Sequence, residues 1–472
     1  MNFRLILPVL LATLTACQQQ TVKVSQPEQS ADAPVKSYML DNGMKILVKE
    51  DHRSPVVVSQ VWYKVGGSYE HQGITGVSHA LEHMMFKGTT RHKPGEFSEI
   101  IAANGGSENA FTGKDYTAYF QRIASDRLEL CLQLESDRMR NLVIKEDEFK
   151  KEIEVIKEER RMRTDDKPTS LTYERFNAVA FLNSSYHQPI IGWMEDLNTM
   201  TVEDLSQWYQ TWYAPNNATL MVSGDVKAQD VFALAKKYFG QLKSSEIPAL
   251  KSRLEVKQLG ERRITVRAPA KVPYLMMGYK VPALKTMIES QQDNIWEVYA
   301  LEVLAGVLDG GDSSRFTASL IRNKEIASAA GAGYDMYGRQ NSLFMLDGTP
   351  TKKSTMKKLE QALIAEIENI KKQPPSEKEL DRVKAQVMAA AVYEQDSSFY
   401  QAMQLGILET VGLGWQIKQD YLKKVQQVTG EQVQAVAKKY LIKDQLTVAL
   451  LDPLPIESRV VRKYKGAVRH GR

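Results

Sequence analysis

The stretch His79-Ala80-Leu81-Glu82-His83 determines how the rest of this 472-residue chain is interpreted. Thr75 as N-cap, an apolar flank and Gly88 shortly after the stretch predict a helix. Residues three and four apart share one helical face, so both imidazoles and the Glu82 carboxylate converge. Two neutral imidazoles form half of a zinc site, and the carboxylate can take a proton from a metal-bound water.

A histidine on a helix is more often a packed or surface residue than a metal ligand, and the pentapeptide alone leaves that alternative open. A catalytic zinc site also needs a third protein ligand. The helical stretch 152–159 offers four carboxylates, of which Glu152 and Glu159 are two turns apart and share a face. Most acid-rich helices are simply solvated, so this stretch gains meaning only together with the histidines.

Residues 1–17 have a basic start, a short apolar run and small residues, which predict a secretory signal peptide. The ending Leu14-Thr15-Ala16-Cys17 resembles a bacterial lipobox, in which cleavage leaves Cys17 as an acylated N-terminus. The alternative is an ordinary signal peptide with an incidental cysteine. Gln18 resembles the pattern of lipoproteins sorted to the outer membrane, so we expect a lipid-anchored protein that faces the periplasm. Residues 18–36 are polar and aperiodic, as in a flexible tether.

Composition limits the remaining possibilities. The chain has 62 Lys and Arg against 57 Asp and Glu, a net charge of +5, without a basic stripe interleaved with aromatics. A nucleic-acid partner is therefore not expected. Cys131 is the only cysteine besides Cys17, so acylation of Cys17 leaves no intrachain disulfide. The basic tail 455–472 would contact anionic lipid or a partner, or be a solvated end.

The order of elements predicts two homologous α+β domains, residues 37–240 and 261–454, joined by a polar linker at 241–260. In the first domain we expect a hairpin at 38–49, a strand at 56–65 and another at 111–120. Tyr299-Ala300-Leu301-Glu302-Val303 lies 220 residues after the His79 pentapeptide and matches it without its histidines. The predicted fold is a duplicated one, with a mostly antiparallel sheet in each domain, helices on one face, and ligands only in the first domain.

With these motifs the chain resembles the pitrilysin/insulinase family of inverted-motif zinc peptidases, and most closely its short, processing-peptidase-like branch. The likeness also includes residues 106–112 with Asp115 and Thr117, residues 187–189 with Gly192, and residues 213–218. It extends over nearly all of residues 37–453. The family places a ligand glutamate about 76 residues after the second histidine, which selects Glu159 rather than Glu158.

The resemblance implies roles for individual residues. His79, His83 and Glu159 would bind one Zn²⁺ per chain, Glu82 would be the catalytic base, and Glu152 would support the ligands from outside. The family binds substrate in extended form along an edge strand, here represented by Asn109, Ala110 and Phe111. The implied substrates are therefore peptides or unfolded polypeptide segments.

The chain departs from the family at one position. The family uses an Arg and a Tyr seven residues apart in a second-half domain; Arg322 matches the Arg, but Ala329 stands at the Tyr position. Loss of such an oxyanion donor costs on the order of 10²–10³ in rate in other enzymes. One explanation, which we favour, is a heterodimer whose homologous second subunit supplies the Arg/Tyr pair. The other is a homodimer with weak or altered catalysis.

These observations predict a zinc metalloendopeptidase at the periplasmic face, attached to the membrane only through its lipid anchor. The alternative from another class is a non-proteolytic scaffold or peptide-binding subunit of the same fold.

Overall fold

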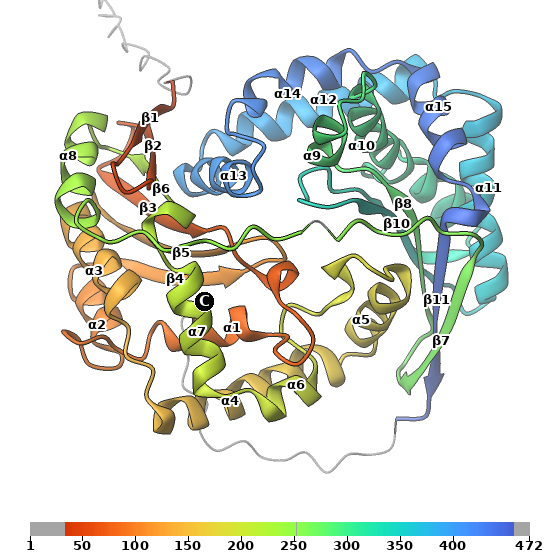
Figure 1. The fold of residues 1–472 in the computed structure, drawn as a ribbon. Coiled ribbons are helices and arrows are strands. Elements are labelled where there is room, and N and C mark those ends of the chain that lie inside the picture. The colour runs from red at the N-terminus through yellow and green to blue at the C-terminus, as the bar shows by residue number, and fades with distance from the viewer. Residues whose placement is uncertain (1–33, 252, 457–472) are drawn as a thin grey trace, which may run out of the picture.

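The computed structural model describes residues 34–251 and 253–456, which form two mixed sheets flanked by helices (Figure 1). The predicted signal peptide 1–17 with Cys17, the tether up to residue 33 and the tail from residue 457 lie outside the described residues. Within the described ranges, no helix is both long enough and apolar enough to cross a membrane.

The first sheet has the strand order β1-β2-β6-β3-β5-β4. Strands β2 and β6 run parallel, and every other neighbouring pair is antiparallel. Helices α3 and α8 pack against one face of this sheet, and α1 packs beside its edge strand β4. The elements of this half are β1 (Lys36–Met39), β2 (Lys45–Glu50), β3 (Val56–Tyr63), β4 (Ser107–Thr112), β5 (Thr117–Ala124), β6 (Ala218–Gly224), α1 (Val77–Met84), α2 (Glu96–Ala103), α3 (Leu128–Asn141), α4 (Glu146–Arg160), α5 (Pro168–Ala180), α6 (Met194–Thr199), α7 (Val202–Trp212) and α8 (Ala228–Phe239).

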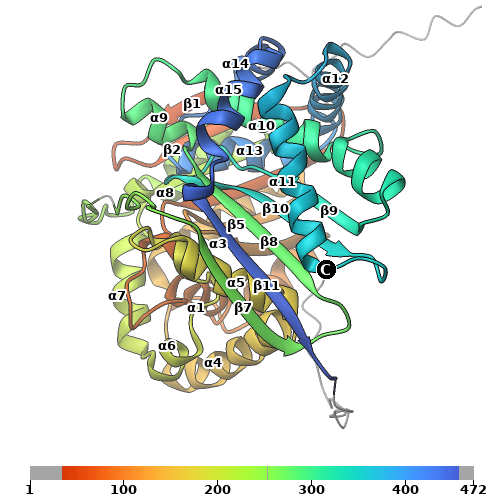
Figure 2. The same cartoon turned by 90° about the vertical axis from the view of Figure 1, so that its right-hand side faces the viewer.

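The second sheet has the order β7-β11-β8-β10-β9, again with one parallel pair, β7 with β11. Figure 2 looks toward this sheet, whose long strands run side by side. Apart from β1, both sheets follow the same order: first, last, second, fourth, third strand. This repetition confirms the predicted fold class. The elements are β7 (Arg262–Pro269), β8 (Tyr274–Val281), β9 (Ala327–Gly333), β10 (Ser342–Pro350), β11 (Leu446–Leu454), α9 (Leu284–Glu289), α10 (Trp296–Asp309), α11 (Met356–Lys372), α12 (Glu377–Glu394), α13 (Ser398–Thr410), α14 (Ile417–Gln426) and α15 (Gly430–Tyr440).

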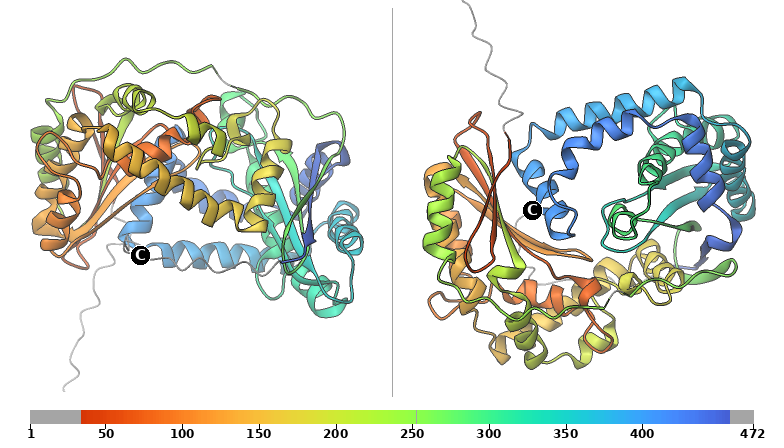
Figure 3. Two further views of the ribbon diagram at one scale, coloured as in Figure 1. Left: turned by 90° about the horizontal axis from the view of Figure 1, so that it is seen from below. Right: turned by 45° about the horizontal axis from the view of Figure 1, so that its top comes forward.

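The two halves exchange helices. Helix α13, from the second half, packs against β3 and β6 of the first sheet, while α5, from the first half, packs against β7, β8 and β11 of the second. Figure 3 shows helices of each half reaching toward the other on opposite sides of the molecule. Each sheet therefore buries its second face under a helix of the other half, which explains why the central strands are buried on both faces.

Two close contacts show how tightly the exchanged helices pack. A Cβ atom on Gly406 of α13 would lie 2.2 Å from the indole ring of Trp62 in the first sheet. A Cβ atom on Gly278 of β8 would lie 2.7 Å from the ring of Phe176 in α5. Only glycine fits at these approaches. Both glycines belong to the second half, one on the exchanged helix α13 and the other on strand β8, which α5 covers.

Two local predictions are wrong. The predicted strand 111–120 is a hairpin of β4 and β5, because a turn at Gly113 reverses the chain, with the Gly113 amide donating to the Tyr116 carbonyl at 2.8 Å. Thr75 does not cap α1; the N-cap residue is Gly76, and the Thr75 hydroxyl donates to Asp196 at 2.5 Å. The predicted hairpin near residues 38–49 is confirmed by the antiparallel pairing of β1 with β2.

Candidate metal centre

Helix α1 presents its two faces to different surroundings. Val77, Ala80, Leu81 and Met84 are buried in the core of the first half. His79, Glu82 and His83 occupy the opposite face, toward α4 and β4, both of which contact α1. The helix is thus fixed by its apolar side, which leaves the polar side to form a site.

The start of α1 is held by a buried carboxylate. The backbone amides of Gly76 and Ser78 donate to the two oxygens of Glu70 at 2.7 and 2.9 Å. These amides would otherwise lack partners at a helix N-terminus, where negative charge is also favourable. Burial raises the pKa of Glu70 to about 7, although the two amides act in the opposite direction.

Helix α4 brings Glu159 to the two histidines. Glu159 Oε2 lies 3.8 Å from His79 Nε2 and 3.4 Å from His83 Nε2. One potential ligand atom from each of the three residues lies within 4.8 Å of the others, and no other such group of His, Cys, Asp or Glu occurs among the described residues. Tetrahedral ligands at normal zinc distances are separated by about 3.4 Å, so this set fits a zinc ion after small adjustments.

The charges of this cluster also suit a cation. Burial and the neighbouring His83 lower the pKa of His79 to about 3, so His79 is neutral, as a metal ligand must be. Burial opposes the charged form of His83, but hydrogen bonds to Glu152 and Glu159 outweigh it and raise the pKa of His83 to about 9. Burial likewise opposes ionisation of Glu159, yet the hydrogen bond from His83 helps to lower the Glu159 pKa to about 2. A metal ion would take the place of the proton that these carboxylates otherwise draw onto His83.

Glu152 lies one step outside this set. Its Oε1 oxygen lies 2.9 Å from His83 Nδ1, and its Oε2 oxygen lies 2.5 Å from Lys87 Nζ. A carboxylate at Nδ1 fixes the tautomer of the imidazole and directs Nε2 toward the metal position. The geometry therefore gives Glu152 the same supporting place that the family resemblance implies.

Glu82 lies between the metal cluster and the edge strand β4. The Thr112 hydroxyl, at the end of β4, donates a short hydrogen bond to Glu82 Oε2. Burial raises the pKa of Glu82, although the Thr112 hydrogen bond opposes this shift. A raised pKa favours proton uptake by the carboxylate.

Among the described strands, β4 pairs only with β5 and forms the edge of the first sheet. Asn109, Ala110 and Phe111 lie on this strand, as expected. Phe111 packs against Trp62, with ring centroids 5.3 Å apart, on the side of the sheet where α13 lies. The alternation of a strand turns Ala110 and Thr112 to the other side, toward α1.

The second-half residues singled out in the sequence lie elsewhere in the fold. Arg322 is on a π-helical segment, Phe316–Asn323, and its half-exposed side chain forms an ion pair with Asp312 at 3.6 Å. Ala329 is on β9, where it pairs with Thr349. Tyr334, the nearest tyrosine, donates to the carbonyl of Pro282 at 2.6 Å.

Sequence reasoning missed three supporting residues: Thr112, Glu70 and Arg163. Arg163 Nη1 lies 2.7 Å from Glu159 Oε1, and its spacing of four residues was a usable signal. Thr112 and Glu70 contact α1 only through the fold, so no local pattern indicates them.

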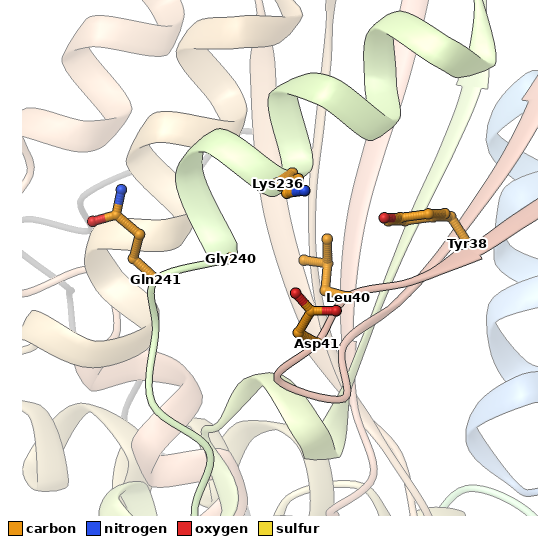
Figure 4. Close-up of a pocket in the computed structure, with 6 residues that line it drawn as sticks. All are labelled: Tyr38, Leu40, Asp41, Lys236, Gly240 and Gln241. Carbon is orange, nitrogen blue, oxygen red and sulfur yellow. The ribbon is translucent and has the colours of Figure 1, made fainter.

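A surface depression lies away from the metal centre, between β1 and the end of α8 (Figure 4). It has a volume of about 240 Å³ and is lined by Tyr38, Leu40, Asp41, Lys236, Gly240 and Gln241. None of the residues of the candidate metal centre lines this depression, so it is not part of that site.

Comparisons with known proteins find one family along most of the chain. The family model described as insulinase (peptidase family M16) matches residues 45–192, and the model described as peptidase M16 inactive domain matches residues 199–387. The zinc protease PqqE of Helicobacter pylori is 35% identical over 384 residues, which cover 80% of this chain and 84% of that protein. The uncharacterized zinc protease YmxG of Bacillus subtilis is 26% identical over 419 residues, covering 89% of this chain and 98% of that one.

Solved structures give the same result for the fold. The crystal structure of a protease from Helicobacter pylori matches with a TM-score of 0.83 and 31% identity, covering 89% of this chain and all of that one. A peptidase M16 inactive domain from Pseudomonas fluorescens matches with a TM-score of 0.78 at 19% identity, covering 90% of this chain and 100% of that one. The predicted resemblance is confirmed, and the chain belongs to peptidase family M16, the insulinase family.

Proposed function

We propose that the chain is a zinc-dependent endopeptidase that binds one Zn²⁺ and hydrolyses peptides or unfolded polypeptide segments. The observation that carries this proposal is the convergence of His79, His83 and Glu159, with the Glu82 carboxylate beside them. Three protein ligands of this kind leave one coordination position for water or substrate. Relatives named zinc proteases support a peptidase function for the family.

A bound zinc ion would supply Lewis acidity and a water of lowered pKa. Thr112 holds Glu82 through Oε2, so we assign the proton transfer to Oε1. Glu82 accepts the proton from the attacking water and later passes it to the leaving amine. Glu152 keeps His83 oriented through Nδ1 while these steps occur.

The free edge of β4 is the proposed substrate-binding strand. An extended peptide that pairs with β4 would be held by main-chain hydrogen bonds, which accept varied sequences. It would pass close to Glu82, because Thr112 at the end of the strand contacts that carboxylate. A substrate segment must be extended and free on both sides of the bond to reach this strand and Glu82, so the proposed substrate class is unfolded or flexible peptide.

The decisive experiment is a cleavage assay on an unfolded peptide with the full-length, zinc-loaded chain, with chelation and zinc re-addition as controls. The proposal expects cleavage that disappears with the chelator and returns with zinc. A chain that binds no zinc, or binds zinc and never cleaves, alone or with a homologous subunit, would favour the scaffold alternative.

We also propose that Ala329 reflects a divided active site, with a homologous subunit supplying the Arg/Tyr pair that the family uses. Arg322 is the residue of this chain that matches the Arg of that pair, and it remains a candidate substrate-binding residue. The alternative to the heterodimer is a homodimer. Mixing the chain with a homologue that carries both residues should raise kcat. Full activity of the purified chain alone would contradict the heterodimer.

For location, we propose attachment to the outer membrane through acylated Cys17, with the peptidase on the periplasmic side. The support is the lipobox-like sequence ending at Cys17. Metabolic labelling with a fatty acid, compared between the wild type and Cys17→Ser, tests this anchor. Equal labelling of both would contradict it.

A further inference from the structure

A buried polar cluster lies where the two halves meet, apart from the metal ligands. At its centre is Asp115, in the turn between β4 and β5, with only 4% of its surface exposed. Its carboxylate accepts hydrogen bonds from the Ser68 hydroxyl (2.5 Å), from the Tyr186 hydroxyl, and from the backbone amide (3.0 Å) and Nε (3.3 Å) of Arg339. Arg339 belongs to the second half, in the loop between β9 and β10.

The guanidinium group of Arg339 makes contacts through both its edge and its planar face. Nη2 donates to the Ser68 hydroxyl at 2.8 Å and to the Ser68 carbonyl at 3.3 Å. The group also stacks over the Tyr69 ring, 4.3 Å from its centre. Lysine has no planar fork and cannot reproduce this set of contacts. A buried carboxylate that loses its cationic partner is strongly unfavourable, so Arg339 and Asp115 hold each other in place.

From this cluster, one short route leads to the catalytic carboxylate. Asp115 lies three residues after Thr112, the last residue of β4, whose hydroxyl donates to Glu82. The turn between them is tied to the preceding segment of the first half, because the Gly67 amide donates to Gly113 at 3.1 Å and the Ser68 amide donates to Lys114 at 2.6 Å. Movement of this turn would therefore move the partner of Glu82.

A second route leads to the metal helix. Ser68, which Arg339 contacts through both its hydroxyl and its carbonyl, lies two residues before Glu70. Glu70 accepts the first amides of α1, from Gly76 and Ser78. Through Asp115 and Ser68, Arg339 thus contacts both the turn that follows Thr112 and the segment that leads to Glu70 and the start of α1.

We propose that Arg339 is a positioning residue for the peptidase site: from the second half, it fixes the β4–β5 turn and the segment before α1. This inference rests on the proposed peptidase function. It gives the half without metal ligands a direct part in the chemistry of the other half. Displacements of about 1 Å, even from changes far from the reacting atoms, cost on the order of 10²-fold in rate.

The test compares full-length, zinc-loaded wild type with Arg339→Met. The matched control is Arg267→Met, which removes an exposed arginine that pairs with Asp452 at 3.2 Å on the second sheet. Zinc content, melting temperature, kcat and KM are measured in the condition in which the wild type cleaves, alone or with a homologous subunit. Hydrogen exchange along the whole chain is measured in the same samples.

For Arg339→Met we expect an unchanged zinc content, a kcat lower by about 10- to 10²-fold and faster exchange confined to residues 107–117 and the segment before α1. The control should match the wild type in all five measurements. Combining Arg339→Met with Thr112→Val should cost less than the product of the two single effects, because both act on Glu82 along one route.

Arg339→Lys keeps the charge but lacks the fork, and it carries the same test if the Met variant does not fold; its kcat should fall between those of the wild type and Arg339→Met. A kcat within twofold of the wild type would overturn the inference and leave the peptidase proposal standing. Zinc loss with faster exchange over the whole chain would also overturn it, since the role would be structural only. A wild type that never cleaves would overturn the peptidase proposal itself, and the inference with it.

Discussion

Helices α1 and α10 occupy corresponding places in their respective halves, but among the described residues only α1 contributes to a set of candidate metal ligands. Both carry a partly buried acid at the corresponding position, Glu82 and Glu302. Beside Glu82 stand two imidazoles and Thr112, whereas Glu302 accepts a hydrogen bond from the Tyr421 hydroxyl at 2.6 Å and has Tyr299 one turn before it. The fold thus provides the site in both halves, and the neighbouring side chains decide whether it can bind a metal.

The helices that pack beside them differ in the same way. Helix α4 contributes Glu152 and Glu159, but α12 has no carboxylate between Asp381 and Glu394. Instead, Arg382 of α12 donates to backbone carbonyls at the end of α10, to Gly306 at 3.1 Å among others. An arginine at a helix C-terminus stabilises that end. The second half therefore keeps the packing of the two helices but has stabilising contacts where the first half has candidate ligands.

The largest expected effect comes from placing the same residue at the two corresponding helix positions. His79→Phe should lower zinc affinity by more than about 10²-fold, since it removes a ligand rather than a supporting contact. Tyr299→Phe removes only a hydroxyl that has no hydrogen-bond partner among the described residues, so zinc binding should not change. Zinc titration of both variants checks this; equal zinc affinities in the two would contradict the assignment of His79.

A pH measurement sharpens the comparison of the two partly buried acids. Burial raises the pKa of Glu302 to about 7, with Asp335 adding to the shift and Tyr421 opposing it. An acid whose pKa is raised on folding destabilises the folded state as pH rises from its unfolded pKa toward 7, here by at most about 3 kcal/mol. Glu302→Gln removes this penalty. The free energy of unfolding of the variant, relative to that of the wild type, should therefore increase from pH 5 to pH 8. Denaturant unfolding at both pH values measures this.

The informative quantity is the change in this relative stability from pH 5 to pH 8, because any pH-independent effect of the amide side chain on stability cancels. A wild type and a variant with parallel stability curves over this range would contradict a raised pKa for Glu302.

The exchange of helices between the halves predicts that added volume at the contact between α13 and the first sheet destabilises the chain. Gly406→Ala should destabilise the chain by about 2 kcal/mol, because the added Cβ overlaps the Trp62 ring. Gly260→Ala is the control, since nothing lies within 4 Å of the Cβ it would add. Thermal unfolding of both variants checks this, and equal melting temperatures would argue against close packing of α13 on the first sheet.

The smallest effect is expected at Glu152. Glu152→Gln keeps an oxygen near His83 but removes the charge that balances it, so zinc affinity should fall by about tenfold. Glu154→Gln, on the same helix and paired only with Lys157 at the surface, is the matched control. Competition with a zinc chelator measures both; an unchanged affinity in Glu152→Gln would remove its supporting role.

Part of this arrangement could be predicted from local signals in the sequence. The spacing within α1 predicted that His79, His83 and Glu82 share one face, whereas Glu159 was selected by the family resemblance, through the family's usual distance from the second histidine. The structure brings the two histidines and Glu159 together. The single strand 111–120 was wrong because the residues on both sides of the turn have strand-like patterns, and the polar turn signal between them, Gly113-Lys114-Asp115, was overlooked.

The contacts between the halves could not be predicted in this way. Helices α5 and α13 have only weakly amphipathic sequences, which do not reveal that each covers the sheet of the other half. The bonds from Thr112 to Glu82 and from Arg339 to Asp115 join residues 30 and 224 positions apart, and only the folded chain brings them together.

The central claim is that Glu82 acts as the base beside a zinc ion held by His79, His83 and Glu159. The most direct test is Glu82→Gln, assayed for zinc content and for cleavage of an unfolded peptide in the condition in which the wild type cleaves. We expect about one zinc per chain in both proteins and a kcat lower by about 10²–10⁴-fold in the variant. Cleavage close to the wild-type rate, with zinc still bound, would contradict the account.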